Sequence, residues 1–155
     1  MRYLVAAYVF LLFYTIGALT IENNVNYDTW RYISPADFKD YHQRLEVLLG
    51  WHMFIPMGTA LILNVVLIFV KSLRPNRWVL ICSAVLFSFI VAFSLAVQVP
   101  LHQELAANFN ERDLNQLIRN HNLIRLPATI ALMLINVLLL LRLLRNNQAV
   151  RNPEI

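Results

Sequence analysis

The residues of this chain best suited to chemistry are its four histidines, which are His42, His52, His102 and His121. Histidine exchanges a proton near neutral pH, so it can act as a general base or as a metal ligand. All four lie in or beside two polar stretches that separate long apolar segments. If the apolar segments cross a membrane, the histidines gather near one membrane face. Ionisable groups at such a boundary need polar partners or water, so we expect a functional site there.

The apolar segments are long enough to cross a bilayer. The chain is 59% hydrophobic and 14% charged, whereas a soluble domain carries about 25% charged residues. A hydrocarbon core about 30 Å thick needs about 20 helical residues. Unbroken apolar runs and few glycines favour helices over a membrane β-barrel. We therefore predict an all-α, up-and-down four-helix membrane bundle, one domain over residues 1–155, with spans at residues 3–20, 48–70, 78–99 and 126–144.

Basic residues predict how the bundle is oriented. The short turn between the second and third spans contains Lys71, Arg74 and Arg77, and further arginines flank the first and last spans. Lys and Arg concentrate in cytoplasmic loops, so we expect both termini to be cytoplasmic and the histidines to face the other side. The net charge of +4 then reflects orientation. No basic stripe interleaved with aromatics is present, so we expect no nucleic-acid partner.

The two polar stretches contain helix-start signals. Ser34 can cap a helix that begins at Pro35, and Asp37 can complete the capping box; Asn110 and Asp113 repeat the pattern. We therefore expect the second and fourth helices to extend above the outer membrane face. We expect residues 21–32 to form a loop that, with a helix at residues 111–122, roofs the mouth of the bundle.

Helical geometry limits which of these side chains can bind one metal ion. With a rise of about 1.5 Å per residue, His42 and His52 are about 15 Å apart along their helix and cannot share an ion. The better set is Glu46 or His52 with His102 and His121, with His42 as an outer member. Imidazole and carboxylate ligands suit zinc, iron, copper or manganese. No H-E-x-x-H or E-x-x-H motif is present. The site could therefore hold a transition metal or have no cofactor. The histidines could instead simply hydrogen-bond to water, headgroups or loops.

Other polar residues near this face could contact a ligand. Arg125, at the top of the fourth span, could bind an anionic substrate, pair with Glu46 or extend to a headgroup. Trp51 adjoins His52 and could line a pocket. Three amide side chains could orient a ligand or form interhelical hydrogen bonds, and these are Gln98, Gln103 and Asn122.

Three short segments carry a family resemblance. They read YHQRL at residues 41–45, VPLHQEL at residues 99–105 and RNHNLIR at residues 119–125. With the four-span layout, they resemble the small membrane family that includes anthrone oxygenases and many bacterial proteins of unknown activity. The resemblance implies a four-helix bundle whose outer mouth oxygenates a lipophilic small molecule without a tightly bound cofactor. The positions that match are His102, His121 and Arg125.

Two classes of function follow from these observations. As an oxidoreductase in a bacterial inner (plasma) membrane, the protein would use His102 or His121 to remove a proton from a lipophilic substrate that enters from the lipid bilayer. Arg125 would stabilise the anion, and Trp51 would pack against the substrate. The alternative is a non-enzymatic structural subunit of a homo-oligomer or larger membrane complex. A lined pocket favours the enzyme, and a filled bundle favours the subunit.

Overall fold

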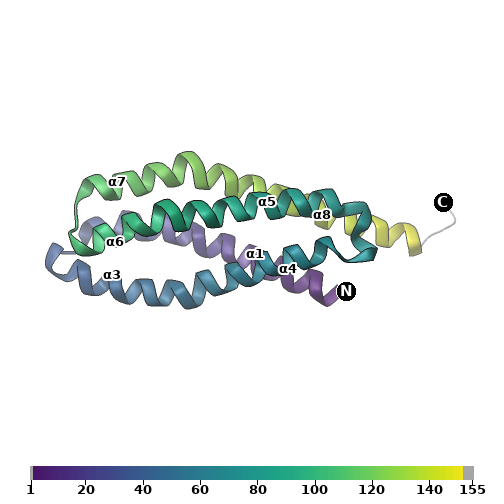
Figure 1. Ribbon diagram of the computed structural model, residues 1–155, viewed down its shortest axis with the longest axis horizontal. Helices are drawn as coiled ribbons and strands as arrows, with labels where there is room; N and C mark the ends of the chain where they lie inside the picture. Colours follow the sequence, from purple (N-terminus) through teal and green to yellow (C-terminus); the bar gives the residue numbers. More distant parts are fainter. Residues whose placement is uncertain (1, 152–155) are drawn as a thin grey trace.

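Four long helical rods run up and down in the computed structural model, which describes residues 2–151 and the side chains of residues 2–145 (Figure 1). The first rod comprises α1 (Arg2–Ile21), the π-helical turn η1 (Glu22–Asn26), α2 (Tyr27–Thr29) and the 3₁₀ turn η2 (Trp30–Tyr32). The second comprises α3 (Pro35–Leu49), the π-turn η3 (Gly50–Phe54) and α4 (Ile55–Ile68). A 3₁₀ turn, η4 (Lys71–Asn76), leads into the third rod.

The third and fourth rods have the same plan. The third comprises α5 (Arg77–Phe93), the π-turn η5 (Ser94–Gln98) and α6 (Val99–Ala107). The fourth comprises α7 (Glu111–Asn120), the π-turn η6 (His121–Arg125) and α8 (Leu126–Arg151). All four rods are long and apolar enough to cross a membrane. The predicted four-helix bundle is confirmed, and the chain is a small integral membrane protein.

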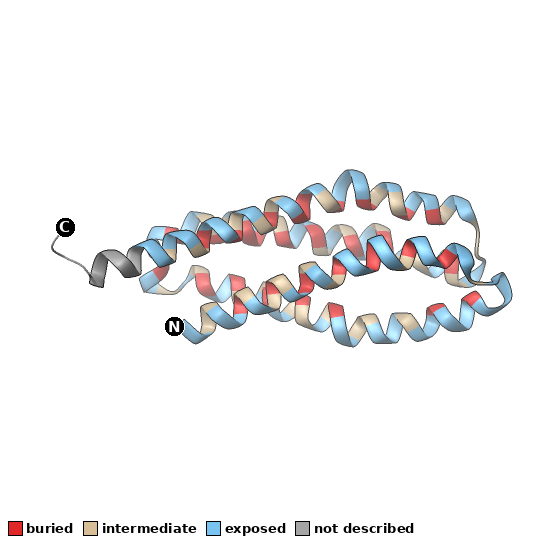
Figure 2. Ribbon diagram, turned by 180° about the vertical axis from the view of Figure 1, so that it is seen from behind, coloured by how far each residue is buried: buried red, intermediate tan, exposed pale blue. Residues whose placement is uncertain are grey.

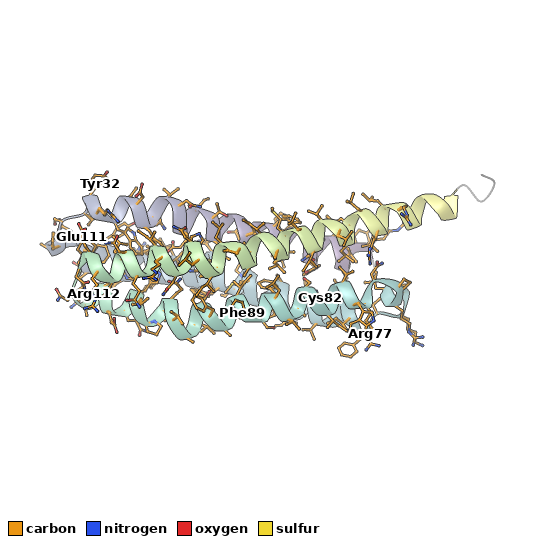
Figure 3. All side chains as sticks on the ribbon, turned by 90° about the horizontal axis from the view of Figure 1, so that it is seen from above. Tyr32, Arg77, Cys82, Phe89, Glu111 and Arg112 are labelled. Atoms are coloured by element: carbon orange, nitrogen blue, oxygen red, sulfur yellow. The ribbon has the colours of Figure 1, made fainter. Side chains whose placement is uncertain are left out.

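Each rod packs against its neighbours in chain order. In the half of the bundle next to the basic turn η4, which we call the inner half, α1 contacts α4, α4 contacts α5, and α5 contacts α8. Contacts between α8 and α1 close the ring. In the outer half, α3 contacts α6, and α6 contacts α7. Figure 3 shows Tyr32, Glu111 and Arg112 at one end of the bundle and Arg77 at the other. The basic turn and the polar turns therefore occupy opposite ends.

The predicted helix starts are present. Ser34 accepts a hydrogen bond from the backbone N–H of Asp37 at 3.2 Å and donates one to the Asp37 carboxylate at 2.6 Å. Asn110 accepts from the backbone N–H of Asp113 at 2.9 Å and donates to its carboxylate at 2.6 Å. Each cap satisfies a backbone donor that the first helical turn leaves free. The second and fourth rods thus begin well outside their predicted spans.

The segment 21–32 is helical, which corrects the prediction of a loop there. The first rod continues to Tyr32, and the third rod likewise continues past its predicted span to Ala107. Helix is favoured because it places Tyr27 and Trp30 on one inward face, where both are buried. All four rods therefore project beyond the predicted spans, not only the second and fourth.

Buried residues, red in Figure 2, occur along the length of the rods. Their apolar side chains form two clusters. The inner cluster fills the membrane-spanning half and includes Leu12, Met57, Phe87 and Leu132. The outer cluster includes Tyr27, Trp30, Phe38, Leu105 and Leu117. The boundary between the two clusters is the level at which all four rods have their π-turns.

Candidate functional site

A cavity of about 260 Å³ lies where the inner and outer clusters meet. Its polar lining comes from all four rods and includes Glu22, Tyr27, Glu46, Gln98, His102 and Arg125. The first and fourth rods contribute buried lining residues, whereas Glu46 on the second rod and Gln103 on the third are exposed. The cavity therefore opens sideways, between the second and third rods. Its apolar wall is formed by Leu49, Met53, Phe54 and Val99.

The π-turns place the lining residues. Each of the four contributes at least one residue to the cavity wall: Glu22 from η1, Met53 and Phe54 from η3, Ser94 and Gln98 from η5, and Arg125 from η6. A π-turn is wider than an α-helical turn; it is rare in proteins and occurs frequently at functional sites. Four of them at one level widen the bundle there.

Prolines explain three of these wide turns. Pro56, Pro100 and Pro127 each lie two residues after a π-turn. A proline inside a helix lacks an N–H, and its ring clashes with the carbonyl four residues earlier. The backbone N–H of the residue before each proline instead donates to the carbonyl five residues earlier, as the Val99 N–H does to the Ser94 carbonyl.

Asparagines accompany the fourth wide turn, η1, which no proline follows. The side-chain amide of Asn23 donates to the Leu19 carbonyl, and that of Asn24 donates to the Thr20 carbonyl at 3.0 Å. These side-chain hydrogen bonds use carbonyl oxygens near the end of α1. They therefore compete with the regular backbone hydrogen bonds of the helix.

A chain of hydrogen-bonded rings runs from Tyr27 through His102 to His42, and its first two members, Tyr27 and His102, line the cavity. The Tyr27 hydroxyl lies 3.0 Å from His102 Nε2, and His102 Nδ1 lies 3.1 Å from His42 Nε2. His42 Nδ1 in turn lies 3.6 Å from a carboxylate oxygen of Glu46. Trp30 packs edge-on against both imidazoles, with ring centroids 5.1 and 5.4 Å away. His42 is therefore an integral member of this chain, whereas the sequence predicts it as an outer member of a metal site.

Burial keeps both imidazoles neutral. Both rings lie outside the four predicted membrane spans. Burial lowers the pKa of His42 from 6.5 to about 4. Burial, with smaller contributions from His42 and Arg125, lowers the pKa of His102 to about 3. Both rings are therefore neutral at neutral pH, and each has one N–H and one unprotonated nitrogen that can accept a hydrogen bond.

Arg125 supplies a buried positive charge beside these neutral rings. Its side chain is 4% exposed, and its guanidinium donates to Asn23 Oδ1 at 3.4 Å. Burial raises the pKa of Glu22, and the nearby Arg125 charge opposes that rise. One oxygen of Glu22 and both amide atoms of Gln98 have no hydrogen-bond partner among the described residues. The polar end of the cavity therefore offers a cation and unpaired donors and acceptors to a ligand.

Three further predicted residues, Trp51, Asn122 and His121, lie outside the cavity lining. Trp51 is 67% exposed, so the structure does not place it against a ligand in the cavity. Asn122 is also exposed. His121 is buried on η6, where its two ring nitrogens have no partner within the described part of the chain. Gln103 lines the cavity at its exposed rim.

The predicted metal ligands do not converge. His52 lies on the exposed side of η3, because Met53 takes the inward position of that turn. Glu46 faces His42 and not His121. Among the residues that the structure describes, no three His, Cys, Asp or Glu side chains lie where they could hold one metal ion. The prediction of a site built from Glu46, His52, His102 and His121 is therefore wrong.

Among the ionisable residues of the cavity wall, sequence reasoning missed Glu22 and Tyr27, because it placed them in a loop. Compared with family models, curated proteins and solved structures, the chain shows no significant match. The candidate site therefore stands on its own geometry.

Proposed function

We propose that this protein binds a lipophilic small molecule with an acidic C–H or O–H group in the cavity and removes a proton from it. One observation carries the proposal: the buried Arg125 guanidinium and the neutral Tyr27–His102 pair line the same cavity, whose other wall is apolar. A base and an anion-stabilising cation beside an apolar wall are what deprotonation of an apolar substrate requires.

The roles divide by position in the cavity. The apolar wall of Leu49, Met53 and Phe54 suits fused rings or an alkyl chain. The unpaired amide of Gln98 can donate to a carbonyl oxygen of the substrate. As the proton leaves, negative charge develops on that oxygen, and Arg125 stabilises it in surroundings from which water is largely excluded.

The resemblance to anthrone oxygenases extends the proposal to oxygenation. The carbanion would react with dioxygen. One oxygen atom would become a carbonyl on the substrate carbon, and the other would leave as water, whose two protons balance the two hydrogens that the CH₂ group loses. The protein's own residues would generate and hold the anion.

We also propose that the cavity faces the non-cytoplasmic side. Arg77 lies at the opposite end of the bundle (Figure 3), and Lys71 and Arg74 belong to the turn η4 that leads into it. Basic residues concentrate on the cytoplasmic side.

Anthrone is a suitable probe, because it is apolar and has an acidic CH₂ group. With the full-length protein in lipid nanodiscs, binding is measured by quenching of tryptophan fluorescence, and turnover is measured with an oxygen electrode. We expect one dioxygen consumed per anthrone, and His102→Gln should lower turnover about 100-fold. Arg125→Gln should weaken binding and turnover together.

Matched controls separate the site from general effects. His52→Gln changes an exposed histidine, and Arg119→Gln changes an exposed arginine on the same rod as Arg125. Both should behave like the wild type. If His52→Gln and His102→Gln have equal effects, or if anthrone does not bind, the proposal is wrong.

A further inference from the structure

The ring chain described above continues from the inner cavity wall to an exposed carboxylate. Tyr27 and His42 are buried, with exposed fractions of 1% and 0%, whereas the Glu46 side chain is 41% exposed. The successive heavy-atom separations are 3.0, 3.1 and 3.6 Å. The last exceeds hydrogen-bond length, and His42 Nδ1 has no hydrogen-bond partner among the described residues. The link therefore requires the exposed Glu46 side chain to move closer to His42.

The chemistry of its two ends gives this chain one direction. A carboxylate accepts hydrogen bonds and donates none, so a hydrogen bond between His42 and Glu46 requires the His42 proton on Nδ1 and leaves Nε2 as an acceptor. His102 must then donate from Nδ1 and accept at Nε2. Its Nε2 partner is the Tyr27 hydroxyl, which has a proton to donate. Every hydrogen bond therefore points from Tyr27 towards Glu46.

We propose that Tyr27, His102, His42 and Glu46 form a proton path that carries the proton removed from the cavity ligand to water at the rim. This inference rests on the proposed function. In one pass, the substrate proton moves to the Tyr27 oxygen as the Tyr27 proton moves to His102 Nε2. The His102 Nδ1 proton moves to His42 Nε2, and the His42 Nδ1 proton moves to the Glu46 carboxylate. Each ring gains one proton and loses one, and Glu46 releases its proton to water.

The surroundings favour concerted proton transfer along the path over storage of the proton on one ring. A doubly protonated His102 would be a buried cation near Arg125, and its lowered pKa reflects that cost. Transfer in which both rings remain neutral avoids the cation. Trp30 and Phe38 pack against His42, at ring-centroid distances of 5.1 and 5.4 Å, and hold it in line.

Histidine tautomers test the path without any substrate. We would record ¹⁵N NMR spectra of histidine-labelled full-length protein in nanodiscs and use His52→Gln and His121→Gln for assignment. Both His42 and His102 should be neutral Nδ1–H tautomers at pH 7. Glu46→Gln, which replaces the acceptor by an amide that can also donate, should shift His42 towards the Nε2–H tautomer. Glu104→Gln, an exposed carboxylate on α6, should leave both rings unchanged. An Nε2–H tautomer of either ring in the wild type, or unchanged signals in Glu46→Gln, would overturn the path.

Anthrone turnover provides the second measurement. Glu46→Gln should lower turnover about tenfold or more and increase the solvent deuterium isotope effect, with anthrone affinity changed less than twofold. Turnover equal to that of the wild type would exclude the path. If wild-type protein does not turn over anthrone, the proposed function fails for this probe, and the NMR result still decides whether the directed chain exists.

Discussion

Two buried asparagines in the membrane-spanning half allow a matched test of what holds the rods together. Asn136 on α8 accepts a hydrogen bond from the Tyr8 hydroxyl at 2.7 Å and donates one to Ser83 Oγ at 2.8 Å. It thereby joins three rods. Asn64 on α4 is equally buried, but both of its amide atoms lack a partner among the described residues. Leucine at either position removes the same amide and keeps a similar volume.

The two substitutions should have different effects on stability. A hydrogen bond between membrane helices contributes about 0.6 kcal/mol on average. Asn136→Leu loses two such bonds, so we expect the free energy of unfolding to fall by about 1 to 2 kcal/mol. Asn64→Leu loses none and removes two unpaired polar atoms from apolar surroundings. Its free energy of unfolding should stay the same or rise by up to about 1 kcal/mol.

The assay is reversible unfolding of the protein in detergent micelles by sodium dodecyl sulfate, followed by circular dichroism. The expected order of stability places Asn64→Leu at or above the wild type and Asn136→Leu below it. Tyr8→Phe combined with Asn136→Leu should be less destabilising than the sum of the single changes, because both remove the same bond. Equal losses for the two asparagine variants would refute the reasoning, since packing alone would then explain both.

Two further predictions concern the cavity. Pro100→Ala removes the cause of the wide turn η5, so we expect α-helical geometry there, a free energy of unfolding higher by about 1 kcal/mol or more, and at least a tenfold loss of anthrone affinity in the fluorescence assay. Pro75→Ala, in the turn at the opposite end, is the control, and unchanged binding in Pro100→Ala would contradict the argument. Secondly, the pKa values of His42 and His102 are about 4 and about 3 in the folded protein, against 6.5 when exposed. The unfolded chain then binds more protons as the pH falls below 6.5, so stability should decrease from pH 6.5 to about pH 4. His102→Gln should flatten this dependence, and a wild-type stability that is constant over this range would count against neutral buried rings.

The fold was largely predictable because its strongest determinants are local. Long apolar runs can satisfy their backbone in a bilayer only as helices, and the caps at Ser34 and Asn110 use side chains three residues from their partners. The segment 21–32 was not predictable in this way. Its composition of Asn, Tyr and Trp favours a loop, and its helix is stabilised by tertiary burial of Tyr27 and Trp30, which local patterns do not show.

The site was predictable only in part for the same reason. The membrane-boundary argument identified His102, Arg125 and Gln98, all of which line the cavity. It could not pair His42 with His102, because their contact joins two rods. One sequence signal for the wide turns does exist. On the third rod, the buried residues Ile90, Ser94 and Gln98 are spaced four apart, and Pro100 follows two residues after Gln98.

The side opening of the cavity determines how a ligand reaches it. The exposed rim residues Glu46 and Gln103 belong to the second and third rods and lie just outside the predicted spans, so the entrance faces sideways at the membrane surface, where lipid meets water, and not the tip of the bundle. A ligand then arrives by lateral diffusion, and occupancy follows its mole fraction in the lipid. Adding empty vesicles at a fixed total amount of ligand should therefore reduce occupancy by dilution, and partition coefficients should rank ligands better than aqueous concentrations do.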